Sequence, residues 1–247
     1  MRTLSLLLLI CLSLPAYANV SESFVQTYPL SSTGAIHLEN VNGPIEIVGW
    51  DKNEVHLEAI KSAPTAEDLS RIHLNIESTS ERLSVKTEYD KKLWIFGSWK
   101  GEVRYRLLVP AKAALKKISA INTNIRVQDV RNDVFLNTVN GKIDASGLTA
   151  SARLETVNGT IIAAYAKINP ATKISLRTVN GRCDLTLPKD TPFNVSSKTV
   201  NGGVRTDTPI RVEKSGATQF RGGVGEGGPA IDFKSVNGEL TIHVTKD

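Results

Sequence analysis

The tripeptide Val-Asn-Gly recurs along the chain, and this repeat limits the fold more than any other feature. A degenerate copy is centred on Asn122, where Thr123 replaces the glycine. From Asn122 onward, successive asparagines are 18, 18, 22, 21 and 36 residues apart. A recurring period of about twenty residues is typical of repeat architectures. The complete copies are centred on Asn42, Asn140, Asn158, Asn180, Asn201 and Asn237.

Alignment of the seven copies on their asparagine shows alternating columns. The residue three positions after the asparagine is always apolar, and the residue three positions before it is always polar. The residue immediately before the asparagine is always β-branched, as in Val139 or Ile121. Alternation with a period of two and enrichment in β-branched residues indicate β-strands. Asn-Gly indicates a tight turn because both residues tolerate positive φ.

Two all-β architectures fit this pattern. The first is a single-stranded β-helix, or solenoid, with short coils of about 18–22 residues, in which equivalent side chains stack and the asparagine amides bond one another. The alternative is an antiparallel β-sandwich or meander whose hairpins turn at Asn-Gly. A meander should show turn signals every 8–12 residues, so the long period favours the solenoid. Strict alternation points the valines outward, unless a bulge or a covering element changes their environment.

Three segments follow from this pattern. Residues 1–18 form a signal peptide, residues 19–114 form an N-terminal β segment that caps or continues the solenoid, and residues 115–247 form the repeat solenoid. Within the second segment we expect a brief helix near 65–71 and strands near 71–78, 82–88 and 102–109. The glycine-rich stretch 222–228 resembles a dinucleotide fingerprint only in its glycines, because a strand-like segment follows it, and we expect a surface loop there.

The N-terminus carries an export signal. Arg2, the apolar run from Leu4 to Leu14 and the sequence Ala16-Tyr17-Ala18 predict cleavage after Ala18. The run is too short for a membrane span, which needs ~20 apolar residues. We therefore expect an exported protein, periplasmic or extracellular. The net charge of +5 is spread along the chain, which disfavours a nucleic-acid partner.

The combined motifs resemble the bacterial putative-adhesin domain family. The matching pieces are the export signal, Leu38–Gly43 followed by Val48–Asp51, Val103–Pro110, the train of Thr-Val-Asn-Gly coils, and the glycine-rich stretch before the last Val-Asn-Gly. The resemblance covers most of residues 35–247. It implies a β-helix-like fold and an exported or envelope location, and it carries over no catalytic residue.

Candidate catalytic and metal-binding residues are sparse. The four histidines lie between apolar neighbours, without the short spacing of a metal site, so we expect neither a metal nor another cofactor. Asp144 and Asp184 occupy the same column two coils apart, at ~10 Å on one face, which leaves open a polysaccharide-active enzyme with paired carboxylates. Cys183 occupies a column of Ile, Val and Leu and is expected to be a buried hydrophobe.

The tentative ligand or partner contacts are aromatic and basic residues between two predicted strands. Exposed aromatics beside cations suit a sugar, a lipid headgroup or a protein; the alternative is that the tryptophans cap an open end of the solenoid. The sequence therefore predicts a non-catalytic binding or scaffold protein of the bacterial envelope, with an envelope glycan or protein as partner. The alternatives are the enzyme and a self-associating structural module. The contact residues are Lys91, Lys92, Trp94, Phe96, Trp99 and Lys100.

Overall fold

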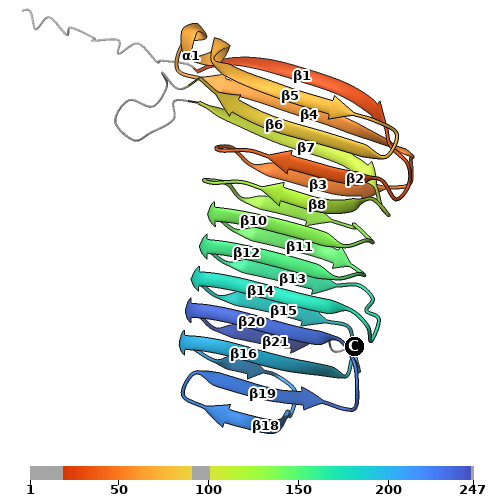
Figure 1. The fold of residues 1–247 in the computed structure, drawn as a ribbon, viewed down its shortest axis with the longest axis vertical. Coiled ribbons are helices and arrows are strands. Elements are labelled where there is room, and N and C mark those ends of the chain that lie inside the picture. Colours follow the sequence, from red (N-terminus) through yellow and green to blue (C-terminus); the bar gives the residue numbers. More distant parts are fainter. Residues whose placement is uncertain (1–18, 91–100, 246–247) are drawn as a thin grey trace, which may run out of the picture.

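The chain forms two long β-sheets that face each other along one stack (Figure 1). The computed structural model describes residues 19–90 and 101–245, so the predicted signal peptide and the segment 91–100 lie outside the described residues. The prediction of an all-β chain with long parallel-strand sheets is confirmed.

Within the described residues, sheet A contains ten strands and sheet B eleven. In spatial order, sheet A consists of β1 (Val20–Pro29), β4 (Glu54–Ala63), β7 (Glu102–Pro110), β3 (Ile45–Trp50), β9 (Ile125–Gln128), β11 (Ile143–Leu148), β13 (Ile161–Tyr165), β15 (Cys183–Leu187), β21 (Leu240–Val244) and β17 (Val204–Thr206). Sheet B consists of β18 (Arg211–Gly216), β19 (Gln219–Val224), β16 (Phe193–Asn201), β20 (Ala230–Asn237), β14 (Lys173–Asn180), β12 (Ala152–Asn158), β10 (Val134–Asn140), β8 (Ala114–Ser119), β2 (Ala35–Glu39), β6 (Arg82–Tyr89) and β5 (Ile72–Ser78).

Each Val-Asn-Gly copy joins a strand of sheet B to the next strand of sheet A. We call each such pair of strands a rung and the Val-Asn-Gly turn its corner. Neighbouring rungs pair in parallel and in register, so that Leu136 lies opposite Leu154 and Leu154 opposite Leu176. On sheet A, Ile143 lies opposite Ile161 in the same way. The Asn-Gly turns therefore cross between sheets, and they do not form the hairpins of the antiparallel alternative.

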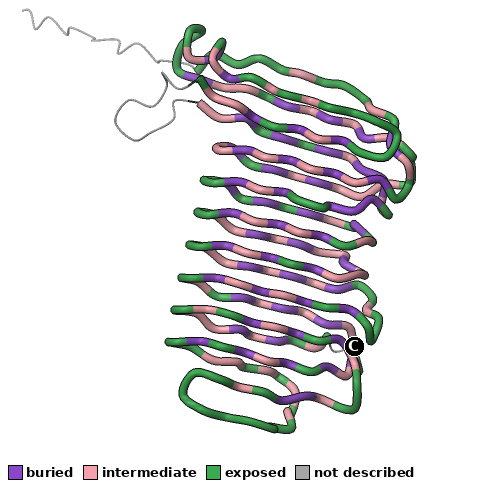
Figure 2. The backbone as a smooth tube through the Cα atoms, in the orientation of Figure 1, coloured by how far each residue is buried: buried purple, intermediate pink, exposed green. Residues whose placement is uncertain are grey.

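The core lies between the sheets and follows the predicted columns. The residues four before and three after each asparagine are buried in the central rungs, as Leu154 and Ile161 show with 0% exposure. The threonine two before the asparagine also points inward, and Thr138, Thr156 and Thr178 are buried. Buried residues alternate with more exposed ones along the central strands up to the threonine (Figure 2), so no bulge is needed at the threonine.

Antiparallel strands occur at the two ends of the stack. At the N-terminal end β1, β4 and β7 pair antiparallel, as do β5 and β6. The helix expected near 65–71 is confirmed as α1 (Ala66–Ser70), which joins β4 to β5. Thr65 is its N-cap, because its Oγ1 accepts a hydrogen bond of 3.0 Å from the amide of Asp68. At the C-terminal end the hairpin β18–β19 pairs with β16.

The last rung in the chain is not the last in space. The β20–β21 rung lies between the β14–β15 rung and the β16–β17 rung, in parallel with both. The glycine-rich stretch 222–228 is not wholly a loop as expected, because Gly222 and Gly223 lie in β19. A Cβ on Gly223 would lie 3.0 Å from the carbonyl oxygen of Phe193. A glycine is used here because the neighbouring backbone approaches closely.

Candidate binding surface along the corner

The asparagines at the corners form one continuous ladder of side-chain hydrogen bonds. Each Nδ2 donates to the Oδ1 of the neighbouring rung toward the N-terminal end of the stack, at 2.8–3.1 Å. At that end, Asn42 Nδ2 donates to the carbonyl oxygen of Gly101 at 3.2 Å. A carbonyl oxygen can only accept, so this contact fixes the direction of every amide. In stack order the ladder runs Asn42, Asn122, Asn140, Asn158, Asn180, Asn237, Asn201.

Close stacking at the corner explains the glycine that follows each asparagine. A Cβ on Gly159 would lie 2.0 Å from the carbonyl oxygen of Gly141, and one on Gly181 would lie 1.8 Å from that of Gly159. In the degenerate copy Thr123 replaces the glycine, and its Oγ1 donates to the carbonyl oxygen of Gly43 at 2.9 Å. The glycine of the repeat is thus explained by the close contact between neighbouring rungs.

The β-branched residue before each asparagine points to solvent. Val41, at the N-terminal end of this valine column, is half-buried. The other members are among the exposed large hydrophobic side chains, and nothing in residues 19–90 and 101–245 covers them. The column runs parallel to the asparagine ladder, one residue away from it. Its exposures in stack order are Ile121 44%, Val139 36%, Val157 38%, Val179 37%, Val236 42% and Val200 61%.

A groove of about 370 Å³ runs beside the valine column on the outer face of sheet B. One wall is the valine column, and the other is the polar column two residues earlier along each strand. This corner groove crosses four successive rungs, from β10 to β20. Its polar wall, extended over the whole stack, reads in stack order Glu39, Ser119, Asn137, Glu155, Arg177, Lys234, Lys198.

Three cations stand on adjacent rungs at the C-terminal end of this wall. Arg177 lies opposite Lys234, and Lys234 lies opposite Lys198. We call these three the cation row. Arg177 Nη1 contacts Glu155 at 3.2 Å and Lys234 Nζ contacts Asp232 at 3.1 Å. Like charges directly opposite in a sheet are destabilising, so the cation row has an electrostatic cost.

On sheet A, in contrast, charges that lie opposite each other differ in sign. On its outer face, Glu58 lies opposite Arg106, Arg106 opposite Glu46, Glu46 opposite Arg126, and Arg126 opposite Asp144. The charges alternate in sign over these five strands, which is the favourable arrangement for cross-strand pairs. The like-charged cation row is therefore a distinguishing feature of sheet B.

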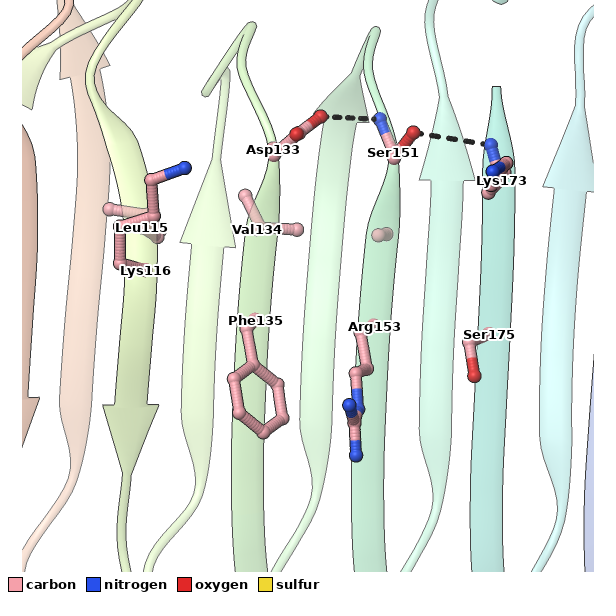
Figure 3. Close-up of a pocket in the computed structure, with 10 residues that line it drawn as sticks. Leu115, Lys116, Asp133, Val134, Phe135, Ser151, Arg153, Lys173 and Ser175 are labelled. Atoms are coloured by element: carbon pink, nitrogen blue, oxygen red, sulfur yellow. Dashed lines mark hydrogen bonds between the residues drawn. The ribbon is translucent and has the colours of Figure 1, made fainter. Parts of the chain in front are cut away.

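A second hollow, of about 250 Å³, lies on the same face near the other end of the strands (Figure 3). Phe135 and Arg153 lie side by side on neighbouring strands, and the Arg153 guanidinium carbon is 4.8 Å from the ring centroid. Lys116 and Lys173 add positive charge to the lining, and Asp133 accepts a hydrogen bond from the Ser151 amide at 3.2 Å. The outer face of sheet B is thus basic beyond the corner groove as well.

A third hollow, of about 540 Å³, lies around Trp50, beyond the end of β3. The Lys52 ammonium lies over the Trp50 ring, 4.7 Å from its centroid. The indole Nε1 donates to the carbonyl oxygen of Glu54 at 2.8 Å. One face of this ring and its polar atom are therefore already used within the chain.

The residues proposed from sequence for ligand or partner contact cannot be placed. Lys91, Lys92, Trp94, Phe96, Trp99 and Lys100 lie outside the described residues. The structural asparagines, in contrast, come together as one ladder. The valine column next to it was visible in the sequence as a column of β-branched residues, but its role as one wall of a groove was not.

The other candidate residues lie apart. His37 and His73 lie on sheet B, whereas His56 and His243 lie on sheet A. Within residues 19–90 and 101–245, no group of three His, Cys, Asp or Glu side chains could hold a metal ion.

Asp144 and Asp184 lie two rungs apart, as the sequence predicts, with Ile162 between them. Lys142 Nζ contacts the Asp144 carboxylate at 2.8 Å, and Arg182 Nε contacts the Asp184 carboxylate at 3.7 Å. Each carboxylate thus has a cation of its own, and an apolar side chain separates the two. This arrangement gives no support to a general acid and base pair.

Cys183 is buried, as predicted, with 0% exposure. Burial raises the pKa of its thiol to about 12, and the nearby Asp184 contributes in the same direction. Because the thiolate is the reactive form, Cys183 is a core side chain and not a nucleophile.

Comparison with known proteins now places the chain. A profile of the Toastrack DUF4097 family matches residues 29–243. The chain belongs to this family. No curated protein matches it in sequence. No helix within residues 19–90 and 101–245 is long and apolar enough to cross a bilayer.

Three solved structures are similar to this Toastrack chain. A "putative cell adhesion protein" of Clostridium sporogenes is 10% identical over 92% of this chain and 100% of its own, with a TM-score of 0.49. A "putative adhesin" of Bacteroides fragilis is 14% identical over 91% and 97%, with a TM-score of 0.47. A "putative lipid binding protein" of Parabacteroides distasonis is 11% identical over 92% and 97%, with a TM-score of 0.29.

Proposed function

We propose that this Toastrack chain is an exported, non-catalytic, adhesin-like binding or scaffold protein of the bacterial cell envelope, and that it binds through its corner groove. The scaffold in this proposal is a β-solenoid of short coils. The observation that carries the proposal is the exposed valine column, which runs beside a charged wall. Soluble proteins rarely expose a contiguous apolar stripe without using it for binding.

The surface chemistry of the corner fits binding better than catalysis. Each asparagine between the two ends of the ladder uses one N–H and one oxygen lone pair within the ladder, which leaves a second donor and a second lone pair for a ligand. The polar groups of the corner therefore need little rearrangement to accept a partner. The export signal in residues 1–18 supports an envelope location.

The test is capture of envelope components by the tagged chain without residues 1–18. In the corner variant, Val157→Glu and Val179→Glu place carboxylates in the apolar wall of the corner groove. In the matched control, Ala164→Glu and Thr186→Glu place the same charges on adjacent rungs of the outer face of sheet A. We expect the corner variant to lose what the wild type captures and the control to keep it, with both melting cooperatively. Equal capture by both variants would contradict the proposal.

Self-association is a second candidate function, and β1 is the observation that favours it. Among the described residues β1 lies at one edge of sheet A, is ten residues long and contains a single charged residue, Glu22. Long edge strands with few charges are templates for pairing with another chain. If β1 pairs with a second copy, Val25→Lys should shift a concentration-dependent dimer to monomer in sedimentation, and Val212→Lys on β18 should not. A wild-type monomer at all concentrations excludes this function.

A further inference from the structure

We infer that the corner groove binds a linear acidic polysaccharide that lies along the axis of the stack; this deepens the proposed function and rests on it. The sequence places one polar column, one valine column and one asparagine ladder side by side, and each repeats once per rung. Rungs are ~4.8 Å apart, and a pyranose ring in an extended chain spans a length of this order. A surface that repeats along one line is suited to a ligand that repeats along the same line.

The cation row gives the sign of the ligand's charge. Arg177, Lys234 and Lys198 stand in line on adjacent rungs. Glu155 and Asp232 offset part of the mutual repulsion at Arg177 and Lys234, and anions in line would relieve the rest. Charge-assisted hydrogen bonds from Lys and Arg to carboxylate oxygens are stronger than neutral ones. The ligand therefore carries more than one anionic group along its length.

The apolar wall and the asparagine ladder give the rest of its chemistry. Val179, Val236 and Val200 run parallel to the cation row and are 37%, 42% and 61% exposed. The C–H edges of sugar rings can pack on such methyl groups. The second N–H and lone pair of each asparagine amide match the donor and acceptor properties of sugar hydroxyls. A uronic acid polymer combines carboxylates, hydroxyls and C–H edges in each repeating unit.

Two other classes of anionic ligand fit less well. An extended acidic peptide gains affinity by pairing its backbone with a free strand edge, but the strands beneath the corner groove already pair on both sides within sheet B. An anionic bilayer is held by inserted Trp, Phe or Leu side chains, but the apolar wall of the corner groove consists of valines.

The test measures binding of polygalacturonate, a linear uronic acid polymer, to the chain without residues 1–18. A neutral linear glucan and vesicles of phosphatidylglycerol are measured in parallel. We expect polygalacturonate to bind, more weakly as salt rises because salt screens exposed charges, and the neutral glucan not to bind. Lys198→Gln with Lys234→Gln should weaken binding at least about tenfold, because two charge-assisted contacts are lost.

The matched control is Lys112→Gln with Lys167→Gln, which removes the same charge from exposed turns at the opposite edge of the stack. This control should change the affinity less than about twofold. Val179→Thr with Val236→Thr keeps the shape and charge of the corner groove and should weaken binding if the methyl groups are contacts.

Three results would overturn the inference: equal loss in the control, equal binding of the neutral glucan, or binding of the vesicles but not of polygalacturonate. Failure of this inference is distinguishable from failure of the proposed function. If envelope capture depends on the corner but polygalacturonate does not bind, the binding function stands and the ligand class is wrong.

Discussion

Substitutions within one rung compare how much each of the three columns contributes to the free energy of unfolding. In β12, Leu154 points into the core, Val157 points to solvent, and Asn158 belongs to the ladder. All three residues lie in the same strand and the same rung, so their alanine variants can be compared directly. We predict that the free energy of unfolding falls most for Leu154→Ala, less for Asn158→Ala, and least for Val157→Ala.

The magnitudes follow from burial and hydrogen bonds. Leu154 is 0% exposed and lies between Leu136 and Leu176, so its truncation leaves a cavity and costs about 2–5 kcal/mol. Asn158 donates at 2.9 Å to Asn140 and accepts at 3.0 Å from Asn180. Two hydrogen bonds of about 0.5–1.5 kcal/mol each are lost, and water can satisfy the freed groups, so we expect about 1–2 kcal/mol. Val157 is 38% exposed, and its truncation should cost under about 1 kcal/mol.

Urea unfolding followed by circular dichroism measures all three. The slope of the free energy with urea should stay constant, because the surface exposed on unfolding does not change. Asn201→Ala adds a control at the end of the ladder, where the asparagine side chain makes one ladder bond, to Asn237; its cost should be about half that of Asn158→Ala. If Asn158→Ala costs no more than Val157→Ala, the ladder does not stabilise the stack and this reasoning is wrong.

Three further predictions concern the core and the close packing of the rungs. Gly159→Ala should destabilise by about 2–4 kcal/mol, because its Cβ would meet the backbone of the neighbouring rung at 2.0 Å; Gly203→Ala, which meets nothing within 4 Å, should melt like the wild type. Cys183 should resist alkylation by iodoacetamide at pH 8 in the folded chain and react after unfolding in urea, and rapid labelling of the folded chain would contradict its burial. Burial raises the pKa of Tyr105 to about 12 from the usual 10. Because the pKa is higher in the folded chain than in the unfolded chain, this tyrosine stabilises the fold below pH 10, and its contribution is lost between pH 10 and 12. In urea titrations across this range, the free energy of unfolding should therefore fall less for Tyr105→Phe than for the wild type.

The column pattern of the core could be predicted from the sequence. Leu154, Ile161 and Cys183 lie where the alignment on asparagine places them, because parallel in-register rungs give equivalent positions the same neighbours. The short helix after Thr65 was also predictable, since an N-cap threonine and acidic residues in the first turn are local signals.

The order of the rungs could not be predicted. The β16 and β20 strands share the polar residue, the valine and the asparagine of the repeat, although the core position four before the asparagine is Ser197 in one and Phe233 in the other. The 36-residue spacing before Asn237 does not say which of them lies beside β14. The hairpin β18–β19 decides the order of the rungs, because this hairpin pairs with the side of β16 that would otherwise be open. Gly222 and Gly223 led to a loop being predicted in place of this hairpin, since glycine is the commonest signal of a loop.

The exposed valines were ambiguous for a physical reason. A β-branched residue suits a strand whether it faces the core or solvent, so periodicity alone leaves its environment open. The groove beside the valines arises only when rungs that are distant in sequence align. The cation row shows this directly, since Lys198 and Lys234 become neighbours of each other only through the insertion of the last rung.

The most direct test of the stack is a pair of engineered disulfides between corner positions. Val179 and Val236 lie on adjacent rungs, within the 4.4–6.8 Å between Cα atoms that a disulfide spans, whereas Val179 and Val200 lie two rungs apart, at ~10 Å. Val179→Cys with Val236→Cys should therefore form an intramolecular disulfide under mild oxidation, and Val179→Cys with Val200→Cys should not. Crosslinking of the second pair in preference to the first would show that the rungs follow chain order, which contradicts the insertion of the last rung between the β14–β15 and β16–β17 rungs.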